Sequence, residues 1–225
     1  MRIGALLLAA LALAAAGCGG SSDDEQSAGT TTAAATQTGP SAPGCEKVDQ
    51  PDAKDDGGQT KPSKPLAADK AYALEVTTNC GTFTIKLDLK SAPNTAASLV
   101  ALAKSGFFDD TIFHRIVPGF VIQGGDPTGS GTGGPGYSTV DPPPADGKYT
   151  YGTVAMAKTQ TEPAGTAGSQ FFVVTAPDAG LPPEYAIVGT VTKGLETVDR
   201  IGNLGNAAEQ PTQTVKIEKV TVVES

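Results

Sequence analysis

The feature that most restricts the fold of this chain is a series of short segments in which apolar and polar residues alternate. Residues 72–78 and 82–88 alternate in this way, and residues 79–81 (Asn-Cys-Gly) between them are typical of a tight turn. Residues 215–223 alternate again near the end of the chain. Because successive side chains of a strand point to opposite faces, these segments predict antiparallel strands with one buried face.

Two segments have a helical pattern instead. A helix is expected to begin near Pro93, with Ser91 or Asn94 as its cap, and to end at Gly106. A second, shorter helix is expected over residues 195–201. Many short strands combined with two helices are typical of an all-β domain in which a closed antiparallel barrel is capped at its ends.

The start of the chain has the pattern of a targeting segment. Residues 1–17 combine a basic start, an apolar stretch and small residues, as a secretory signal peptide does, and the stretch is shorter than the roughly 20 residues of a membrane-spanning helix. Cys18 follows Ala15-Ala16-Gly17, which resembles the lipobox of bacterial lipoproteins. This resemblance implies cleavage before Cys18 and a lipid on its sulfur. An ordinary signal peptide, with Cys18 unmodified, is the alternative.

Residues 18–68 are rich in Ser, Thr, Gly, Ala and Pro, and such a segment buries too little apolar area to offset its backbone entropy. We predict a lipid-anchored flexible linker, which tethers a domain of residues 69–225 to the outer face of the cell membrane or the periplasmic side. Exported chains meet an oxidising environment, so we predict a disulfide between Cys45 and Cys80. Two free thiols are the alternative.

The composition argues against several other functions. A formal net charge of −8 has the wrong sign for phosphate groups, so no nucleic-acid partner is expected. His114 is the single histidine and the three cysteines are scattered, so no metal site is expected. The chain has no G-x-S-x-G nucleophile motif, which argues against a hydrolase.

Three runs of residues carry the most distinctive chemistry. Residues 113–126 read Phe-His-Arg-Ile-Val-Pro-Gly-Phe-Val-Ile-Gln-Gly-Gly-Asp. Residues 154–157 read Val-Ala-Met-Ala, and residues 168–173 read Gly-Ser-Gln-Phe-Phe-Val. Each run combines strand-forming residues with isolated polar side chains, so we expect strands that present these polar groups at a surface.

The phase of each strand predicts which side chains share a face. With strict alternation, Gln170 and Phe172 lie on one face, and Arg115 lies on the same face as Phe113, opposite to His114. One Arg, two Gln and several Phe in matching phases are expected to line a shallow pocket.

These runs resemble the signature of the cyclophilin family of peptidyl-prolyl cis/trans isomerases, and the likeness extends from about residue 72 to residue 223. The resemblance implies a closed eight-stranded antiparallel β-barrel capped by two α-helices. It implies an enzyme that accelerates rotation of X–Pro bonds in proline-containing polypeptides, assists the folding of exported proteins and uses no cofactor or metal. A monomer is expected. The implied catalytic residues are Arg115, Phe120 and Gln123, and the implied substrate-binding residues are Val121, Gly131, Ala157, Lys158, Gln170, Phe172, Leu181 and Tyr185.

The rim of the implied groove departs from the family pattern. Lys158 stands where the family usually has Asn, and Tyr185 stands where it has His. Gly180 replaces a Trp that the family associates with cyclosporin binding. These changes leave a second function open, a proline-binding chaperone or scaffold module with little turnover. The retained Arg115 and its Phe and Gln neighbours favour the enzyme.

Overall fold

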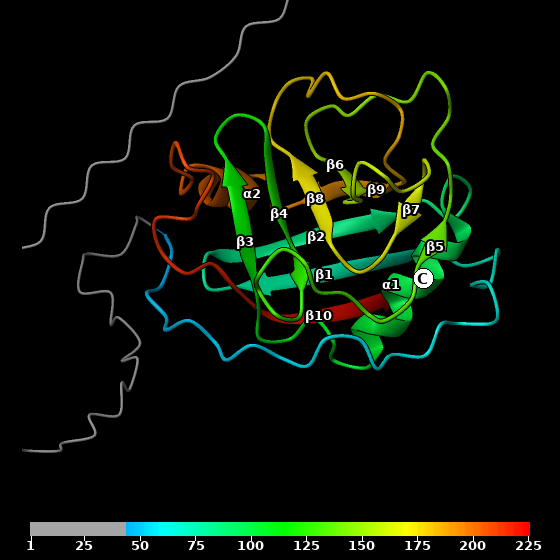
Figure 1. Cartoon of the computed structure of the whole chain (residues 1–225), viewed down its shortest axis with the longest axis horizontal. Coiled ribbons are helices and arrows are strands. Elements are labelled where there is room, and N and C mark those ends of the chain that lie inside the picture. Colours follow the sequence, from blue (N-terminus) through cyan, green and yellow to red (C-terminus); the bar gives the residue numbers. More distant parts are fainter. Residues whose placement is uncertain (1–43) are drawn as a thin grey trace, which may run out of the picture. The chain divides into compact units, whose positions relative to one another are not determined.

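The computed structural model describes residues 44–225, and its central feature is a closed barrel of eight strands (Figure 1). Neighbouring strands follow the order β1-β10-β3-β4-β8-β6-β9-β2, and all pairs are antiparallel. A separate two-stranded sheet joins β5 to β7. This confirms the predicted fold class. The elements are β1 (Tyr72–Thr78), β2 (Gly81–Leu87), α1 (Pro93–Lys104), β3 (Thr111–Val117), β4 (Val121–Asp126), β5 (Thr139–Val140), β6 (Thr153–Met156), β7 (Thr166–Ala167), β8 (Phe171–Val174), β9 (Ile187–Lys193), α2 (Leu195–Gly202) and β10 (Lys216–Glu224).

The barrel interior is filled by large apolar side chains. Phe83, Phe113 and Ile122 are completely buried there, and Phe171 packs edge-on against Phe113 with ring centres 6.0 Å apart. Helix α1 packs against β10 and β5, and α2 packs against β2, β3 and β4. Because the interior is closed by side chains, any substrate groove must lie on the outer surface of the barrel.

Helix α1 begins without the cap that the sequence predicts. Its N-cap is Ala92, which makes no side-chain cap, and neither Ser91 nor Asn94 takes that role. The carboxylate of Asp141 accepts hydrogen bonds from the backbone N–H of Thr95 (2.7 Å) and from the side-chain amide of Asn94 (2.8 Å). The Asp141 carboxylate, which is distant in sequence, therefore binds a backbone N–H of the first helical turn that a local cap would otherwise bind.

Strand β3 contains a bulge, and its side chains therefore do not lie on the faces that strict alternation predicts. Phe113 pairs with Gly124 and Arg115 pairs with Gln123, so one step along β4 corresponds to two steps along β3, and His114 is the additional residue. Such a bulge reverses the alternation of side chains. Phe113 consequently lies in the core while Arg115 lies in an outer pocket, and the prediction that they share a face was wrong.

Residues 45–61, which we call the strap, lie against the domain (the blue-to-cyan segment of Figure 1). A disulfide joins Cys45 to Cys80, the predicted pair. The Lys54 ammonium donates to the carbonyls of Gly106, Phe107 and Asp109 at 2.8–3.0 Å. Hydrogen bonds and a disulfide therefore hold this part of the predicted linker. The predicted signal peptide (residues 1–17), the lipidation site Cys18 and linker residues 18–43 lie outside the described residues.

Neither helix of the described part of the chain, residues 44–225, has the length and hydropathy of a membrane-spanning segment.

Candidate active site

Two adjoining pockets on the outer surface of the barrel gather the predicted site residues. The first, which we call the apolar pocket, has a volume of about 220 Å³. It is lined by Arg115, Phe120, Val121, Gln123, Ala157, Lys158, Phe172, Leu181 and Tyr185. The second, which we call the loop pocket, has a volume of about 310 Å³ and includes the two other predicted residues, Gly131 and Gln170. Gln123, Ala157 and Lys158 line both pockets, so the two are continuous.

The barrel itself brings the central residues together. Arg115 of β3 pairs with Gln123 of β4, Gln123 pairs with Phe172 of β8, and Phe172 pairs with Ala155 of β6. These residues form one row across four neighbouring strands. Because directly paired residues on one face of a sheet have Cβ atoms about 5 Å apart, this register places Gln123 between Arg115 and Phe172, and all three side chains line the apolar pocket.

Aromatic rings form a rigid wall of the apolar pocket. The rings of Phe172 and Tyr185 meet edge-on with centres 5.6 Å apart, and buried Tyr149 packs against both. The Tyr149 hydroxyl donates to the carbonyl of Tyr185 (2.8 Å) and accepts from its backbone N–H (2.9 Å). Burial raises the pKa of Tyr149, so its hydroxyl keeps its proton at neutral pH.

A chain of hydrogen bonds orients the polar side of the site. Arg115 Nη1 donates to Gln123 Oε1 (3.4 Å), and Gln123 Nε2 donates to Gln170 Oε1 (3.0 Å). Gln170 Nε2 donates in turn to the carbonyls of Gly131 (3.0 Å) and Gly133 (2.9 Å). Each amide uses its oxygen toward Arg115 and its nitrogen toward the loop, so the direction of the whole chain is defined.

The loop that ends this chain is organised by Asp126, the last residue of β4. Its carboxylate accepts backbone N–H groups of Thr128 (2.7 Å), Gly131 (2.5 Å) and Gly133 (3.2 Å). Burial alone raises the pKa of this carboxyl, but the hydrogen bonds from Thr128, Gly133 and Gly131 outweigh it, and the net pKa lies below the ordinary value of 3.8. Asp126 is therefore ionised at neutral pH.

Lys158 lies between the two pockets, and its charge is well compensated. Its side chain is 3% exposed, its ammonium pairs with Glu184 (3.1 Å) and it lies 5.5 Å from the centre of the Tyr185 ring. It also donates to the carbonyls of Thr159 and Glu162 (both 3.2 Å). Lys158 and Tyr185 both depart from the family pattern, and they contact each other. This contact connects the two loops of the rim.

Gly180, the third departure, leaves the rim open. A Cβ built on it meets no heavy atom within 4 Å, so this position contributes no wall.

His114 does not face the site. It lines neither pocket, and both of its ring nitrogens are buried without a hydrogen-bond partner. Burial lowers its pKa, which Asp126 partly offsets and Arg115 reinforces, so the ring is neutral at pH 7. Among the described residues, no group of three or more His, Cys, Asp or Glu could hold a metal ion. Two cations, Arg115 and Lys158, line the apolar pocket. The Lys158 ammonium is already bound to Glu184 and two carbonyls, so we regard Arg115 as the donor for a ligand.

Three residues around the site were missed from the sequence. Glu209 pairs with Arg115 Nε at 2.7 Å, although no motif surrounds it. Tyr149 lies outside the three runs of residues and 36 residues before its partner Tyr185, so its packing had no local signal. Asp126 lies three residues before Gly129, the first glycine of a Gly-rich loop, and an Asp at the start of such a loop could have indicated an acceptor for turn N–H groups.

Comparison with known proteins identifies relatives of the whole barrel. Residues 73–222 match the family model described as cyclophilin type peptidyl-prolyl cis-trans isomerase/CLD. The peptidyl-prolyl cis-trans isomerase-like 1 of Aspergillus oryzae is 38% identical over 164 residues, which cover 71% of this chain and 98% of the relative. The isomerase-like 2 of Cryptococcus neoformans is 37% identical over 163 residues, which cover 69% of this chain but only 28% of that relative.

A solved structure is similar in fold. The cyclophilin type isomerase of Cryptosporidium parvum, crystallised in the presence of the dipeptide Ala-Pro, has a TM-score of 0.62 and 32% sequence identity. The alignment covers 67% of this chain and 98% of the solved chain.

Proposed function

This chain belongs to the family of cyclophilin-type peptidyl-prolyl cis-trans isomerases, and we propose that it accelerates X–Pro bond rotation in exported polypeptides. The observation that supports this most directly is the row of paired residues that sets the Arg115 guanidinium beside a small apolar pocket walled by Phe172. An apolar pocket suits a prolyl ring, and an adjacent cation suits the nitrogen of that ring.

The chemistry follows from the structure of the amide. Resonance gives the X–Pro bond partial double-bond character and a barrier of about 20 kcal/mol. At the twisted transition state resonance is lost, and the prolyl nitrogen gains a lone pair. A donor aimed at that nitrogen stabilises the twisted state more than the planar one, which is the condition for catalysis. The planar, always charged guanidinium of Arg115 is suited to this role.

The other site residues position the substrate. Phe120, Val121, Phe172 and Leu181 surround the prolyl ring, and Tyr185 closes the rim. Gln123 and Gln170 fix the guanidinium and offer polar contacts to the substrate backbone. The preceding carbonyl then rotates beside Ala157 and Lys158, in a less aqueous setting than bulk solvent.

Substitution of Arg115 tests this proposal. One hydrogen bond to a charged donor is worth about 1.5–3 kcal/mol, so Arg115→Ala is expected to lower kcat/KM for an Ala-Pro peptide by roughly ten- to a hundredfold. Arg115→Lys keeps the positive charge but loses the planar guanidinium, so its kcat/KM should lie between those of the wild type and Arg115→Ala. The measurement is magnetisation exchange between the cis and trans peptide by NMR, with circular dichroism as the control for folding. Equal turnover of wild type and Arg115→Ala would refute the role of Arg115.

The altered rim favours one alternative, a proline-binding chaperone with little turnover. Gly180 leaves one side of the groove open, and Lys158 with Glu184 changes its polar edge. Titration of the same peptide separates the two functions. Shifts of signals around Phe172 without faster cis/trans exchange would favour the binding module.

Location is the second part of the proposal. The apolar stretch before Cys18 supports a lipoprotein signal peptide over residues 1–17, an anchor on Cys18 and a linker that reaches the strap. The Cys45–Cys80 disulfide supports an oxidising compartment outside the cytoplasm. Labelling with a fatty-acid analogue in the native host tests this: wild type should be labelled and Cys18→Ser should not. A labelled Cys18→Ser protein would contradict the anchor.

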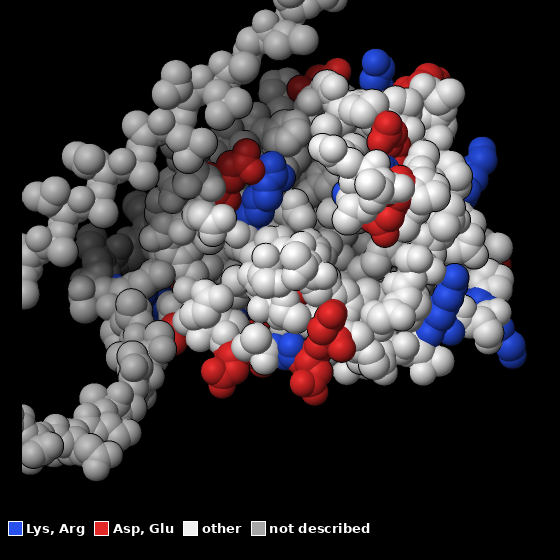
Figure 2. All heavy atoms as spheres, viewed as in Figure 1, with Lys and Arg blue, Asp and Glu red and all other residues white. Residues whose placement is uncertain are grey.

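The expected partners are proline-containing polypeptides and, through the lipid, a membrane. No nucleic-acid partner is proposed, because the net charge of −8 has the wrong sign for phosphate groups. Figure 2 shows Lys and Arg interspersed with Asp and Glu on the face that it draws. We propose that the chain acts as a monomer, which sedimentation of the purified protein would test.

A further inference from the structure

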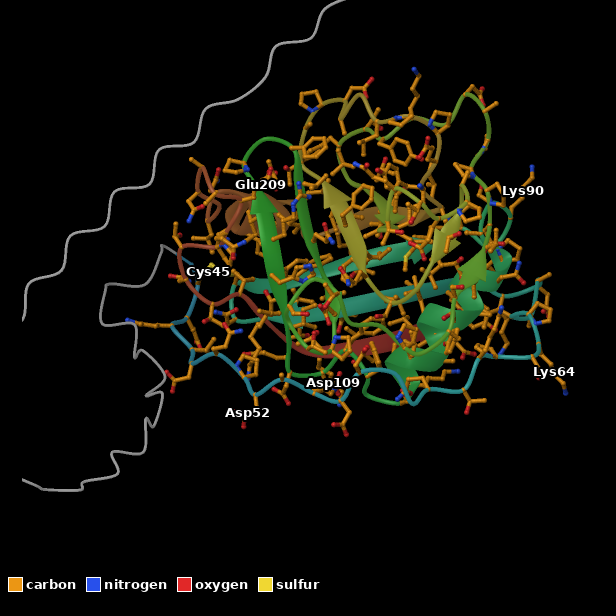
Figure 3. The ribbon with its side chains drawn as sticks, viewed as in Figure 1. Cys45, Asp52, Lys64, Lys90, Asp109 and Glu209 are labelled. Carbon is orange, nitrogen blue, oxygen red and sulfur yellow. A yellow bond between two sulfur atoms is a disulfide. The ribbon has the colours of Figure 1, made fainter. Side chains whose placement is uncertain are left out.

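A carboxylate contacts the proposed catalytic arginine on the side away from the glutamine chain. Arg115 Nε donates to Glu209 Oε2 at 2.7 Å, while Nη1 donates to Gln123 Oε1 at 3.4 Å. In Figure 3 Glu209 is labelled near the tip of the β3 arrow. We propose that Glu209 is a positioning residue for Arg115, a role that rests on the proposed function.

The loop that carries Glu209 is built to hold it. The side-chain oxygen of Asn206 accepts the backbone N–H groups of Ala208 (2.8 Å) and Gln210 (3.1 Å), and the Asn206 carbonyl accepts that of Glu209 (2.9 Å). The Glu209 carbonyl accepts the N–H of Ile116 in β3 (3.0 Å). Glu209 adopts a φ of 62°, in the left-handed region that few non-glycine residues occupy. The backbone of Glu209 is thus joined to the strand that carries Arg115.

Two fixed hydrogen bonds orient a guanidinium more strictly than one. Arginine has five N–H donors in a rigid plane, and a free side chain samples many rotamers. With Nε engaged by Glu209 and Nη1 engaged by Gln123, the orientation of that plane is defined, and so is the direction of its remaining donors at the apolar pocket. Glu209 therefore lowers the entropy that the arginine would otherwise lose at the transition state.

The Arg115–Glu209 ion pair is partly exposed to solvent, which limits its contribution to the reaction rate and makes that contribution sensitive to salt. The side chains of Arg115 and Glu209 are 34% and 48% exposed. For exposed pairs of this kind we expect Glu209→Ala to lower kcat roughly two- to fivefold, with little change in KM. Glu209→Gln keeps an acceptor oxygen for Nε and should recover part of the loss. Raising the ionic strength to about 1 M should slow the wild type more than Glu209→Ala.

The experiment compares these variants in the full chain, with Glu218→Ala as the matched control because Glu218 is an exposed glutamate of β10 outside both pockets. The Glu218 variant should keep the turnover of the wild type. In the Arg115→Ala background, Glu209→Ala should have no further effect, because Glu209 acts only through the arginine. Faster turnover of Glu209→Ala, or an equal loss in both backgrounds, would overturn the proposal.

A second readout does not depend on turnover. The NMR signal of the Arg115 Nε–H should exchange slowly with water in the wild type and rapidly in Glu209→Ala. An unchanged signal would overturn the proposal, because it would show that Glu209 does not hold the guanidinium. A wild type that binds peptide but does not turn it over would refute the proposed enzyme instead, and the Nε signal would still report whether Glu209 orients Arg115.

Discussion

At the scale of single residues, the buried carboxylate of Asp126 connects a strand of the barrel to the loop that receives the glutamine chain. It is fully buried and accepts three backbone N–H groups of that loop, from Thr128, Gly131 and Gly133. Gly131 and Gly133 are also the residues whose carbonyls accept Gln170. The Asp126 carboxylate therefore holds the loop on its barrel side, while the side-chain amide of Gln170 holds it on the side of the site.

The charge of Asp126 predicts a pH-dependent stability. Since its folded-state pKa lies below the ordinary value of 3.8, its contribution is complete above that value and is lost as the pH falls through the folded-state pKa. Asp126→Asn keeps the volume but removes the charge, and should lower the free energy of unfolding at pH 7 by about 2 kcal/mol. Urea unfolding followed by circular dichroism at pH 7, 5 and 3 would measure the difference between wild type and variant.

Between pH 5 and pH 3 that difference should shrink, because the carboxyl of the unfolded wild type, with its ordinary pKa of 3.8, takes up a proton there. The low pKa of His114 also reduces stability as the pH falls below its ordinary value of 6.5. Asp126 partly offsets that low pKa, so the loss should be larger in Asp126→Asn, and the difference between the two proteins should widen from pH 7 to pH 5. The decrease expected from Asp126 itself is therefore read between pH 5 and pH 3, and a difference that does not shrink in that interval would show that the Asp126 charge is not what holds the loop.

At the scale of elements, local patterns and long-range contacts differ in what the sequence can predict. The β1–β2 hairpin and β10 follow from alternation, because alternation is a property of each segment alone. The bulge at His114 depends on how β3 pairs with β4, and the start of α1 depends on Asp141. The bulge is a property of the pairing and not of β3 alone, and Asp141 lies 46 residues from Thr95. Strict alternation and local capping rules therefore led to wrong predictions at both places.

The residues of the candidate site also form two groups, those that the sequence could predict and those that only the fold brings into place. The eleven predicted residues line two adjoining pockets. Seven of them lie in the three runs of residues, and the other four could be named because the order and spacing of motifs along the chain resemble those of a known family. Glu209 and Tyr149 lie outside these motifs, and only the fold brings them to Arg115 and Tyr185. The disulfide of the strap was predicted, but the rest of the strap was predicted as flexible linker because the hydrogen bonds that attach it leave no apolar periodicity in the sequence.

At the scale of the whole molecule, the strap links the disulfide to the loop beside the site. Gly57 N–H donates to the carbonyl of Gly134 (2.9 Å), Gln59 N–H donates to that of Pro135 (3.0 Å), and Asp56 accepts the N–H of Gly134 (2.8 Å). Gly134 directly follows the glycine whose carbonyl accepts Gln170. The question is whether the strap supports only the stability of the domain or also the geometry of the site.

Removal of the disulfide separates these two effects. Cys45→Ser combined with Cys80→Ser frees a loop with a sequence separation of 35, and loop entropy gives such a bond roughly 3 to 4 kcal/mol. The free energy of unfolding in urea should fall by about this amount. Turnover at 10 °C, where the variant is still folded, should change less than about twofold, because the hydrogen bonds between strap and loop do not involve the disulfide and Asp126 holds the loop independently of the strap.

Chemical reduction of the wild type should reproduce both results, which controls for the two serines. If turnover instead fell tenfold in a variant that circular dichroism shows to be folded, the strap would be part of the active site. The catalytic unit would then begin near Cys45, and oxidation of the two cysteines would control activity as well as stability. The position of Asp126 between barrel and loop predicts the first outcome, because its hydrogen bonds to Gly131 and Gly133 involve no residue of the strap.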